Sequence, residues 1–429
     1  MHPCRTRIIV QAPFRLFRRM TRILHTADWH LGARLVEQER TEEHGLFLQW
    51  LLQELRDQPP DLLVIAGDIF DSANPPQQAL RQYYDFLAQV SLTTSIRVLV
   101  LGGNHDSAVT LHAPRELLKS LRIDVVGLIP EEPEKAIFEL DQAVICAVPF
   151  LRERDVRRAA PGQSTEEIAA QMREGIASHY SRLLESAAAR AAGRAILATG
   201  HLTAADGERS DSERKIHIGG LGAVGVQCFD GFDYVALGHL HRPQKVGGRD
   251  EVRYSGSPIP LSFDEIAVGK QVLRIEIDGK NPVRITSVPV PRFRPMHRCL
   301  CTLDDMGEKL RALAMPDTGL RGWVDLIVTH ELMVPDLERR VREIVQGLPL
   351  TVLKKKVTGS KAEKTPELFG GRGLHEVERE EIFEERLRRK GIDPDSETGR
   401  RLRGTFVDLL GRMLDASVAG EKTFAGGTV

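Results

Sequence analysis

The chain has 429 residues, enough for two or three domains, and its 59 Lys and Arg residues almost balance its 60 Asp and Glu residues. This balance excludes a uniformly basic chain, so any contact with nucleic acid must come from local basic patches. The five cysteines are an odd number without a C-x-x-C pair, which argues against a disulfide framework and indicates a reducing compartment. No apolar run approaches the roughly 20 residues of a membrane helix.

Five short apolar segments are each followed by Asp, Asn or His. They lie at residues 23–30, 62–68, 98–106, 195–201 and 234–241. Each has the pattern of a buried strand of a parallel-rich α/β sheet, in which ligands bind outside the carboxyl ends of the strands. In the first segment, Asp28 and His30 are two residues apart, so their side chains leave the same face if the strand continues through them.

These strand ends supply seven oxygen or nitrogen donors, more than one metal ion needs. They are Asp28, His30, Asp68, Asn104, His201, His239 and His241. Two ions that share a bridging carboxylate, roughly 3.5–4 Å apart as in two-metal hydrolases, would use all seven. Any single motif could instead cap a helix or close a turn, but five at successive strand ends favour a metal site.

The segments between these strands predict β-α-β units. Residues 39–58 and 77–90 have helical spacing, residues 113–121 form a short helix, and residues 164–192 form a long one that follows a strand at 143–149. Tyr83 and Tyr84 are predicted to lie in the core, not on a base-stacking platform.

Some basic residues could contact a substrate phosphate. Arg152 and Arg154 are two of the four arginines within residues 151–158, a segment that could equally be the solvated start of a helix. Arg242 directly follows His241 and could neutralise a phosphate or pair with a nearby Asp. The turn-rich stretch 254–264 is predicted to be a loop beside the site, with no chemical role that the residues indicate.

The last third of the chain carries no metal-type motif. Four prolines within residues 279–295 predict a linker, and residues 297–356 predict a small domain of order strand, helix, strand, helix, strand. Lys354, Lys355 and Lys356 could contact DNA or guard a sheet edge. Two helices are expected at 375–390 and 397–415. The apolar stripe of the second (Leu402, Phe406, Leu409, Leu410, Met413 and Leu414) is expected to dock on this chain or, preferably, on a partner helix.

The motifs D-x-H, G-D, G-N-H, G-H and G-H-x-H, in this order, resemble the metallophosphoesterase (calcineurin-like) superfamily. Three further stretches resemble the SbcD family, the nuclease subunits of bacterial SbcC–SbcD complexes: ILHTADWHLG (23–32), AGDIFD (66–71) and RYSGSPIPLSFDE (253–265). The resemblance covers residues 21–265 well and the rest loosely. It begins near Met20, so we expect residues 1–19, which hold five arginines and no acid, to be disordered or non-native; a genuine basic arm is the alternative.

The resemblance implies two ligand sets that share Asp68. One ion is expected at Asp28, His30, Asp68 and His241, and the other at Asp68, Asn104, His201 and His239. His105 falls at the position of the family's catalytic histidine. His and carboxylate ligands admit Mn, Fe, Zn or Co, and the resemblance favours Mn²⁺.

The resemblance also implies an architecture and partners. The expected fold is an α/β sandwich of two mixed sheets flanked by helices, with a nuclease domain at 20–280, a DNA-positioning capping domain at 281–356, a helical pair at 367–416 and a disordered tail at 417–429. The helical pair would bind an SbcC-type ATPase, since this chain has no ATP-binding G-x-x-x-x-G-K-[ST] motif. A homodimer within a cytoplasmic, nucleoid-associated heterotetramer is expected.

The expected activity is metal-dependent cleavage of DNA, as a 3′ to 5′ exonuclease on duplex ends and an endonuclease on single strands and hairpins, in repair and recombination. One alternative keeps the chemistry but takes a phosphoprotein or a small molecule such as a cyclic nucleotide. The other is a non-catalytic scaffold for DNA ends.

Overall fold

The structure is a computed structural model that describes residues 20–158, 163–210, 212–213, 223–279, 281–314, 319–330, 334, 336–359, 383–384, 386–388, 390 and 392–406. The expectations for residues 1–19 and 417–429 lie outside the described residues. The chain divides into two compact units, Met1–Val357 and Thr358–Val429. Among the described helices, none combines the length and the apolar character needed to cross a membrane.

The first unit contains two six-stranded mixed sheets. The first sheet has the order β14 (Arg284–Pro289), β13 (Gln271–Ile277), β1 (Thr21–Thr26), β4 (Leu62–Ala66), β5 (Arg97–Leu101) and β6 (Ile123–Val126). Strands β1, β4, β5 and β6 are parallel, and β13 and β14 run antiparallel to their neighbours.

The second sheet has the order β11 (Gln244–Val246), β12 (Arg249–Tyr254), β10 (Tyr234–Gly238), β9 (Ala195–His201), β8 (Ala143–Cys146) and β7 (Ile137–Glu139). Its four inner strands are parallel, and β7 and β11 close its edges in antiparallel pairing. The carboxyl ends of β9 and β10, which carry His201 and Gly238, are therefore side by side.

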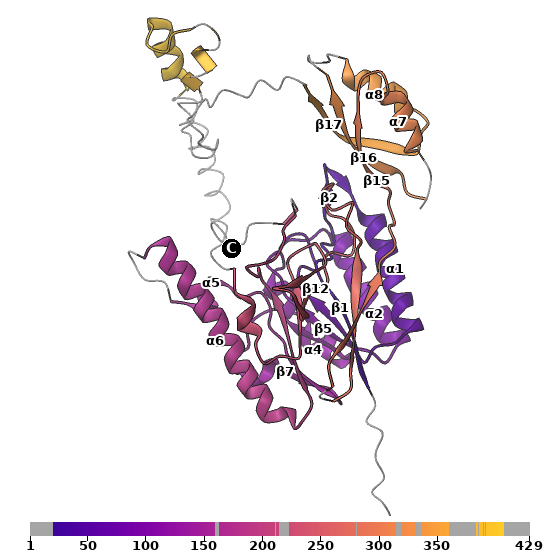
Figure 1. Cartoon of the computed structure of the whole chain (residues 1–429), viewed down its shortest axis with the longest axis vertical. Coiled ribbons are helices and arrows are strands. Elements are labelled where there is room, and N and C mark those ends of the chain that lie inside the picture. The colour runs from indigo at the N-terminus through magenta and orange to yellow at the C-terminus, as the bar shows by residue number, and fades with distance from the viewer. Residues whose placement is uncertain are drawn as a thin grey trace, which may run out of the picture. The chain divides into compact units, whose positions relative to one another are not determined.

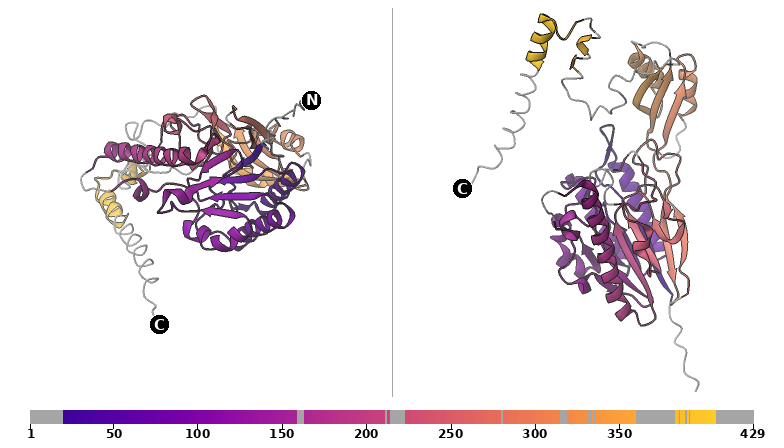
Figure 2. Two further views of the ribbon diagram at one scale, coloured as in Figure 1. Left: turned by 90° about the horizontal axis from the view of Figure 1, so that it is seen from below. Right: turned by 60° about the vertical axis from the view of Figure 1, so that its left-hand side comes forward.

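The two sheets pack face to face, with helices on both outer faces. Ile23, Val64, Leu197 and Ala236 belong to the apolar cluster between the sheets. Helices α1 (Thr41–Asp57) and α2 (Gln77–Thr93) cover the first sheet, and α6 (Thr165–Ala191) covers the second (Figures 1 and 2). Because both of their faces are buried, the inner strands β4, β8 and β10 are apolar throughout. The predicted α/β sandwich of two mixed sheets flanked by helices is confirmed.

Short elements complete this part of the chain: β2 (Arg34–Leu35), β3 (Gln38–Glu39), α3 (Ala108–His112), α4 (Arg115–Ser120), η1 (Pro133–Ala136), α5 (Glu153–Val156) and η3 (Val226–Phe229). The start of α6 is set by a capping box, in which Ser164 Oγ accepts from Glu167 N and Glu167 Oε2 accepts from Ser164 N. Tyr83 is buried in the core as predicted. The cysteines of the described residues are free thiols.

The predicted linker at 279–295 is wrong over its middle part. Residues Arg284–Pro289 form β14, which pairs with β13 at the edge of the first sheet. An edge strand tolerates proline because its outer backbone groups need no partner strand. Pro289 is the last residue of β14, so the connection to the next domain begins only at Val290.

The accessory domain has the predicted element order. Its elements are β15 (Met296–Cys301), α7 (Met306–Ala312), β16 (Gly322–Thr329), α8 (Leu337–Val345) and β17 (Leu350–Thr358), and β16 is the central strand of its sheet. The lysine run lies on the edge strand β17, where Lys355 pairs with Glu338 and Lys354 Nζ lies 5.8 Å from the ring centre of Phe263.

In the second unit, residues 397–406 are helical, as are parts of 383–388. The rings of Phe383 and Phe406 stack with centroids 4.2 Å apart, and Arg403 pairs with Glu384, so the two segments pack together. Leu402 is 38% exposed. The remaining stripe residues, Leu409, Leu410, Met413 and Leu414, lie outside the described residues.

Candidate metal centre

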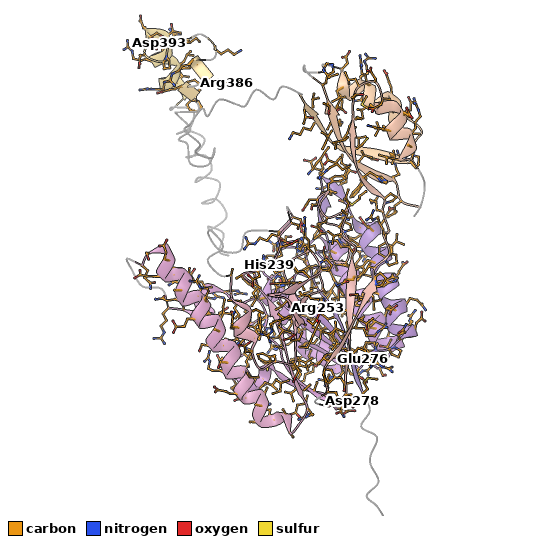
Figure 3. All side chains as sticks on the ribbon, in the orientation of Figure 1. His239, Arg253, Glu276, Asp278, Arg386 and Asp393 are labelled. Carbon is orange, nitrogen blue, oxygen red and sulfur yellow. The ribbon has the colours of Figure 1, made fainter. Side chains whose placement is uncertain are left out.

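The strand ends of both sheets converge on one point. The first sheet contributes Asp28 and His30 after β1, Asp68 after β4, and Asn104 and His105 after β5. The second contributes His201 at the end of β9, and His239 and His241 after β10. All of these side chains except Asn104 are at most 6% exposed. His239 lies at one end of the sandwich, and Glu276 and Asp278 mark the other end (Figure 3).

The first strand does not continue through Asp28 and His30, so the condition under which their side chains would leave the same face is not met. Strand β1 ends at Thr26, and Asp28, His30 and Asp68 have φ angles of 55°, 46° and 48°, in the left-handed region. Backbone bonds from Asp28 N to Gly67 O and from His30 N to Asp68 O hold the two loops together. Such strain persists only where the surroundings enforce it, and it is common at functional sites.

Asp68 is the centre of the cluster. Its Oδ2 lies 3.6 Å from His30 Nε2, 3.2 Å from His201 Nε2 and 4.0 Å from His105 Nε2. Its Oδ1 accepts the amide of His105 at 2.9 Å, which fixes the carboxylate plane. One carboxylate oxygen therefore faces ligands from both sheets, as a bridge between two ions requires.

The hydrogen bonds of the histidines determine which nitrogen faces the centre. The Nδ1 of His201 lies 2.9 Å from Ala66 O, and the Nδ1 of His30 lies 3.1 Å from Asp71 Oδ1. Because these oxygens only accept, each Nδ1 carries the proton, and the lone pair of a neutral ring is on Nε2, toward Asp68. This is the tautomer that binds a metal.

Two of these nitrogens face each other. His30 Nε2 and His241 Nε2 are 3.1 Å apart, next to the Asp68 carboxylate. Two lone pairs at this distance repel unless a proton or a cation lies between them. The geometry therefore fits a divalent cation.

The second half of the cluster is built around Asn104. Its Oδ1 lies 3.0 Å from His201 Nε2 and 3.2 Å from His239 Nδ1. Asp28 Oδ1 accepts the amide of His239, whereas the buried Asp28 Oδ2 has no hydrogen-bond partner among the described residues. An unsatisfied buried carboxylate oxygen is costly, and a bound cation would satisfy it.

Two groups have ligand atoms within 4.8 Å of one another: His30, Asp68 and His105, and Asp68, His201 and His239. They share Asp68, so the site is a two-metal His/Asp site of the kind typical of metallophosphoesterases. His105, which the sequence suggested as catalytic and not necessarily a ligand, lies within the first group. His241 is adjacent to the first group, because its Nε2 contacts His30 Nε2. Asp28 is adjacent to the second, with Oδ1 3.9 Å from His201 Nδ1.

The carboxylates and histidines shift each other's pKa values. Burial raises the pKa of Asp28 to about 7. Burial also opposes ionisation of Asp68, but the neighbouring His201, His30 and His105 hold the pKa of Asp68 well below its ordinary value. Burial opposes protonation of His201, but the carboxylates of Asp68 and Asp28 overcome this effect and raise the pKa of His201 to about 9. Burial lowers the pKa of His239 well below its ordinary value. The negative field that draws a proton to His201 would equally attract a cation.

The three arginines suggested as phosphate contacts lie in different settings. Arg242 is partly buried and pairs with Asp264 at 3.4 Å and Glu208 at 3.7 Å. Pairing with a nearby Asp was one of the two roles that the sequence suggested for it. Arg152 and Arg154 lie at α5, where they help to line a surface hollow of about 640 Å³, and Arg154 lies 3.9 Å from Asp155.

Comparison with known proteins agrees with this geometry. A family model described as calcineurin-like phosphoesterase matches residues 21–243, just over half of the chain. The SbcD component of the nuclease SbcCD from Escherichia coli (strain K12) is 33% identical over 394 residues, which cover 91% of this chain and 98% of that protein. The corresponding SbcD component from Rhodobacter capsulatus is 38% identical over 318 residues, which cover 69% of this chain and 76% of that protein. This chain belongs to the calcineurin-like phosphoesterase family, in its SbcD group.

Two further comparisons give matches to this SbcD-group chain. A family model described as type 5 capsule protein repressor C-terminal domain matches residues 292–390, which include the accessory domain. Among solved structures, a dimetal phosphatase from Danio rerio aligns over 63% of this chain and 99% of that one, with 11% identity and a TM-score of 0.37.

The structure also reveals supporting residues that the sequence reasoning missed. Asp71 is the last residue of the SbcD-type AGDIFD stretch. Its carboxylate accepts a hydrogen bond from His30 Nδ1 at 3.1 Å, and its backbone oxygen accepts one from His105 Nδ1 at 2.7 Å. The Asp106 carboxylate accepts the amides of Gly103, Ile69 and Phe70, which joins the two metal-site loops. Both lie in motifs that the sequence marked, which is the only signal that could have indicated them.

Proposed function

We propose that this chain is a metal-dependent DNA nuclease component that hydrolyses phosphodiester bonds. The observation that carries the proposal is the contact of His30 Nε2 with His241 Nε2 beside the shared Asp68 carboxylate. Such a cluster of lone pairs is suited to cations, and two cations side by side suit the hydrolysis of phosphate esters.

The ions would be held by the seven residues that the sequence indicated: Asp28, His30, Asp68 and His241 for one, and Asp68, Asn104, His201 and His239 for the other. We propose that both ions are Mn²⁺, one of the several first-row metals that His and carboxylate ligands can bind. The bound ions would neutralise the phosphate and activate water.

His105 is the proposed catalytic residue. Its Nδ1 donates to Asp71 O at 2.7 Å, so the ring is fixed with Nε2 toward Asp68. In the protonated form Nε2–H is directed into the site, where it would donate a hydrogen bond to the phosphate or a proton to the leaving alkoxide.

The arginines and the accessory domain are assigned to substrate positioning. Arg152 and Arg154 would contact the DNA backbone beside the site, since α5 follows Phe150, whose ring lies 6.4 Å from that of His201. Arg242 would act on phosphate only by leaving its pairs with Asp264 and Glu208. Of the residues 281–356 expected to form a capping domain, those of the accessory domain, from β15 to β17, would position the DNA.

We further propose that the chain works in a complex. Its relatives are named as subunits of SbcCD nucleases, and the partner would be an SbcC-type ATPase bound by the C-terminal helices within 367–416. The substrates would be duplex ends, cut 3′ to 5′, and single strands and hairpins. A homodimer within a cytoplasmic heterotetramer is part of this proposal.

The test is cleavage of a DNA hairpin and of a blunt duplex by the purified chain with Mn²⁺, alone and with the ATPase. We expect Asp68→Asn and His105→Ala to abolish cleavage but to bind DNA like the unaltered chain. A phosphoesterase for small substrates would turn over p-nitrophenyl phosphate far better than the hairpin. A scaffold would bind DNA ends with no cleavage in any of these proteins. Either of these two results would overturn the proposal.

A further inference from the structure

The stretch 253–265 and the nearby Lys270 surround one metal-site residue, His241. Five residues contact it or each other there, and we call them the His241 clamp: Ser212, Glu213, Ser257, Glu265 and Lys270. None of them was given a role by the sequence motifs, and none is among the proposed metal ligands.

The side chain of His241 is contacted at Nδ1, the ring nitrogen that faces away from the metal site. Its Nδ1 lies 2.6 Å from Ser212 Oγ and 3.5 Å from Glu265 Oε1, and Ser212 Oγ also donates to that carboxylate oxygen. With Nδ1 engaged on this side, Nε2 is directed at His30 Nε2, 3.1 Å away. The contact thus orients the nitrogen that faces the metal site.

The backbone of His241 is fixed by the same residues. Its amide donates to Glu213 Oε1 at 2.7 Å. Its carbonyl oxygen accepts from Lys270 Nζ at 2.9 Å and from Ser257 N at 3.1 Å. The position of the ring and the position of the chain that carries it are therefore set by one connected network.

Glu265 and Lys270 form the charged core of the clamp. Glu265 is 0% exposed and Lys270 is 7% exposed, and their Oε2 and Nζ atoms are 2.6 Å apart. Glu265 Oε2 also accepts the amide of Leu261, and its Oε1 accepts from Ser210 Oγ at 2.9 Å. A buried ion pair adds little net stability, because desolvation of the two charges offsets their attraction. Its location behind a metal-site histidine is therefore the informative feature.

We propose that Glu265 and Lys270 are positioning residues that keep His241 oriented toward the metal site, with Ser212 as the hydroxyl that connects them to its Nδ1. A carboxylate behind a ligating histidine fixes its tautomer and increases its basicity, which raises metal affinity. This inference rests on the proposed function, since it assigns His241 as a metal ligand. It predicts that Glu265 affects one metal site and not the other.

The test is Mn²⁺ binding to the metal-stripped full chain, followed by electron paramagnetic resonance of the unbound ion, with thermal unfolding as the measure of folding. The unaltered chain should bind two ions. Glu265→Gln should weaken one site by about 10- to 100-fold and leave the other unchanged, and His241→Asn should affect that same site more strongly. Lys270→Met should act in the same direction, because it withdraws the donor from the His241 carbonyl.

The matched control is Glu54→Gln. Like Glu265, Glu54 pairs with a basic residue, Arg274 of β13, and both side chains of this pair are 18% exposed. This variant should keep both sites. If Glu265→Gln does not fold, Ser212→Ala removes the connecting hydroxyl from a part-buried loop position and should weaken the same site.

Three results separate the possibilities. Loss of affinity at one site supports the inference. Two unchanged sites in folded Glu265→Gln and Ser212→Ala variants, or equal weakening of both sites, would overturn it and leave the proposed function intact. An unaltered chain that binds fewer than two ions would overturn the proposed function, and the inference with it.

Discussion

Gly103 lies so close to Asp68 that a Cβ atom in its place would stand 2.1 Å from Asp68 Oδ1 and 2.2 Å from Asp68 N. Both neighbours are fixed, because the Oδ1 atom accepts the amide of His105 and the backbone of Asp68 has a left-handed φ. The glycine before the Asn-His pair is thus a condition for the position of the bridging carboxylate.

We therefore expect Gly103→Ala to displace Asp68 and to lose Mn²⁺ binding at both sites. The measurement is the number of ions retained after gel filtration. Gly269→Ala is the control, since a Cβ there meets no atom within 4 Å. Retention of two ions by Gly103→Ala would contradict this account of the bridge.

Asp106 should matter for both stability and activity. Its carboxylate accepts three backbone amides from the two loops that carry Asp68 and His105. An amide side chain has one acceptor oxygen in place of two, so Asp106→Asn leaves a buried N–H unsatisfied and should cost about 1–3 kcal/mol of unfolding free energy. Urea denaturation measures this loss, and hairpin cleavage should fall in parallel. A variant with unchanged stability would show that the loops do not depend on this carboxylate.

His25 should make the protein sensitive to acid. Its neutral ring is satisfied by Tyr234 Oη at 2.9 Å and Leu237 O at 3.2 Å, and burial lowers its pKa to about 3. Its pKa is near 6.5 in the unfolded chain, which therefore binds a proton that the folded chain does not. The stability contributed by neutral His25 is complete above pH 6.5 and falls as the pH decreases toward 3, by about 2 kcal/mol at pH 5.

The measurement is the unfolding free energy of the unaltered chain and of His25→Gln between pH 7.5 and pH 5. The variant should be less stable at pH 7.5 but should lose less stability on acidification. Parallel pH profiles for the two proteins would exclude His25 as the source.

Trp323 should hold the accessory domain to the rest of its compact unit. Its ring lies 4.2 Å from the Arg294 guanidinium and 5.7 Å from that of Arg40, and Arg40 donates two hydrogen bonds to Glu43. Because Trp323 is 4% exposed, Trp323→Ala should cost about 3–5 kcal/mol.

Limited proteolysis near residues 290–295 should become faster in that variant. The control is Leu300→Ala, also on the accessory sheet but 59% exposed, which should change stability by less than about 0.5 kcal/mol. Equal cleavage rates in both variants would show that the domain is held by other contacts.

The sequence was sufficient for the five strands that lead into the site and for the set of residues that meet there. Runs such as 62–66 and 234–237 are apolar at every position because both faces of each sheet are buried, and this pattern does not depend on distant contacts. Parallel strands of one sheet then bring their carboxyl ends to one edge, which is why Asp28 and Asp68, after the neighbouring strands β1 and β4, could be grouped in advance. That His239, after a strand of the second sheet, shares an ion with Asp68 was implied by the family resemblance.

Other features depend on contacts that no local pattern encodes. Asp28 and His30 look like consecutive outward positions of a strand, but hydrogen bonds to the loop after β4 force them into left-handed conformations. The prolines of 279–295 suggested a linker, yet an edge position allows β14 to form. Glu265 is separated from His241 by strands β11 and β12 and a turn-rich stretch, so only the folded chain brings their side chains to 3.5 Å.

The metal-site residues are divided between two sheets that are joined elsewhere mainly by apolar packing, in the cluster of Ile23, Leu197 and their neighbours. An ion held by Asp68 from one sheet and His201 from the other would act as a cross-link at the end of the sandwich. Each tenfold rise in metal concentration above the dissociation constant would then add about 1.4 kcal/mol to the free energy of unfolding. Cellular metal supply would in this way govern how long the folded chain survives, independently of whether it is turning over substrate.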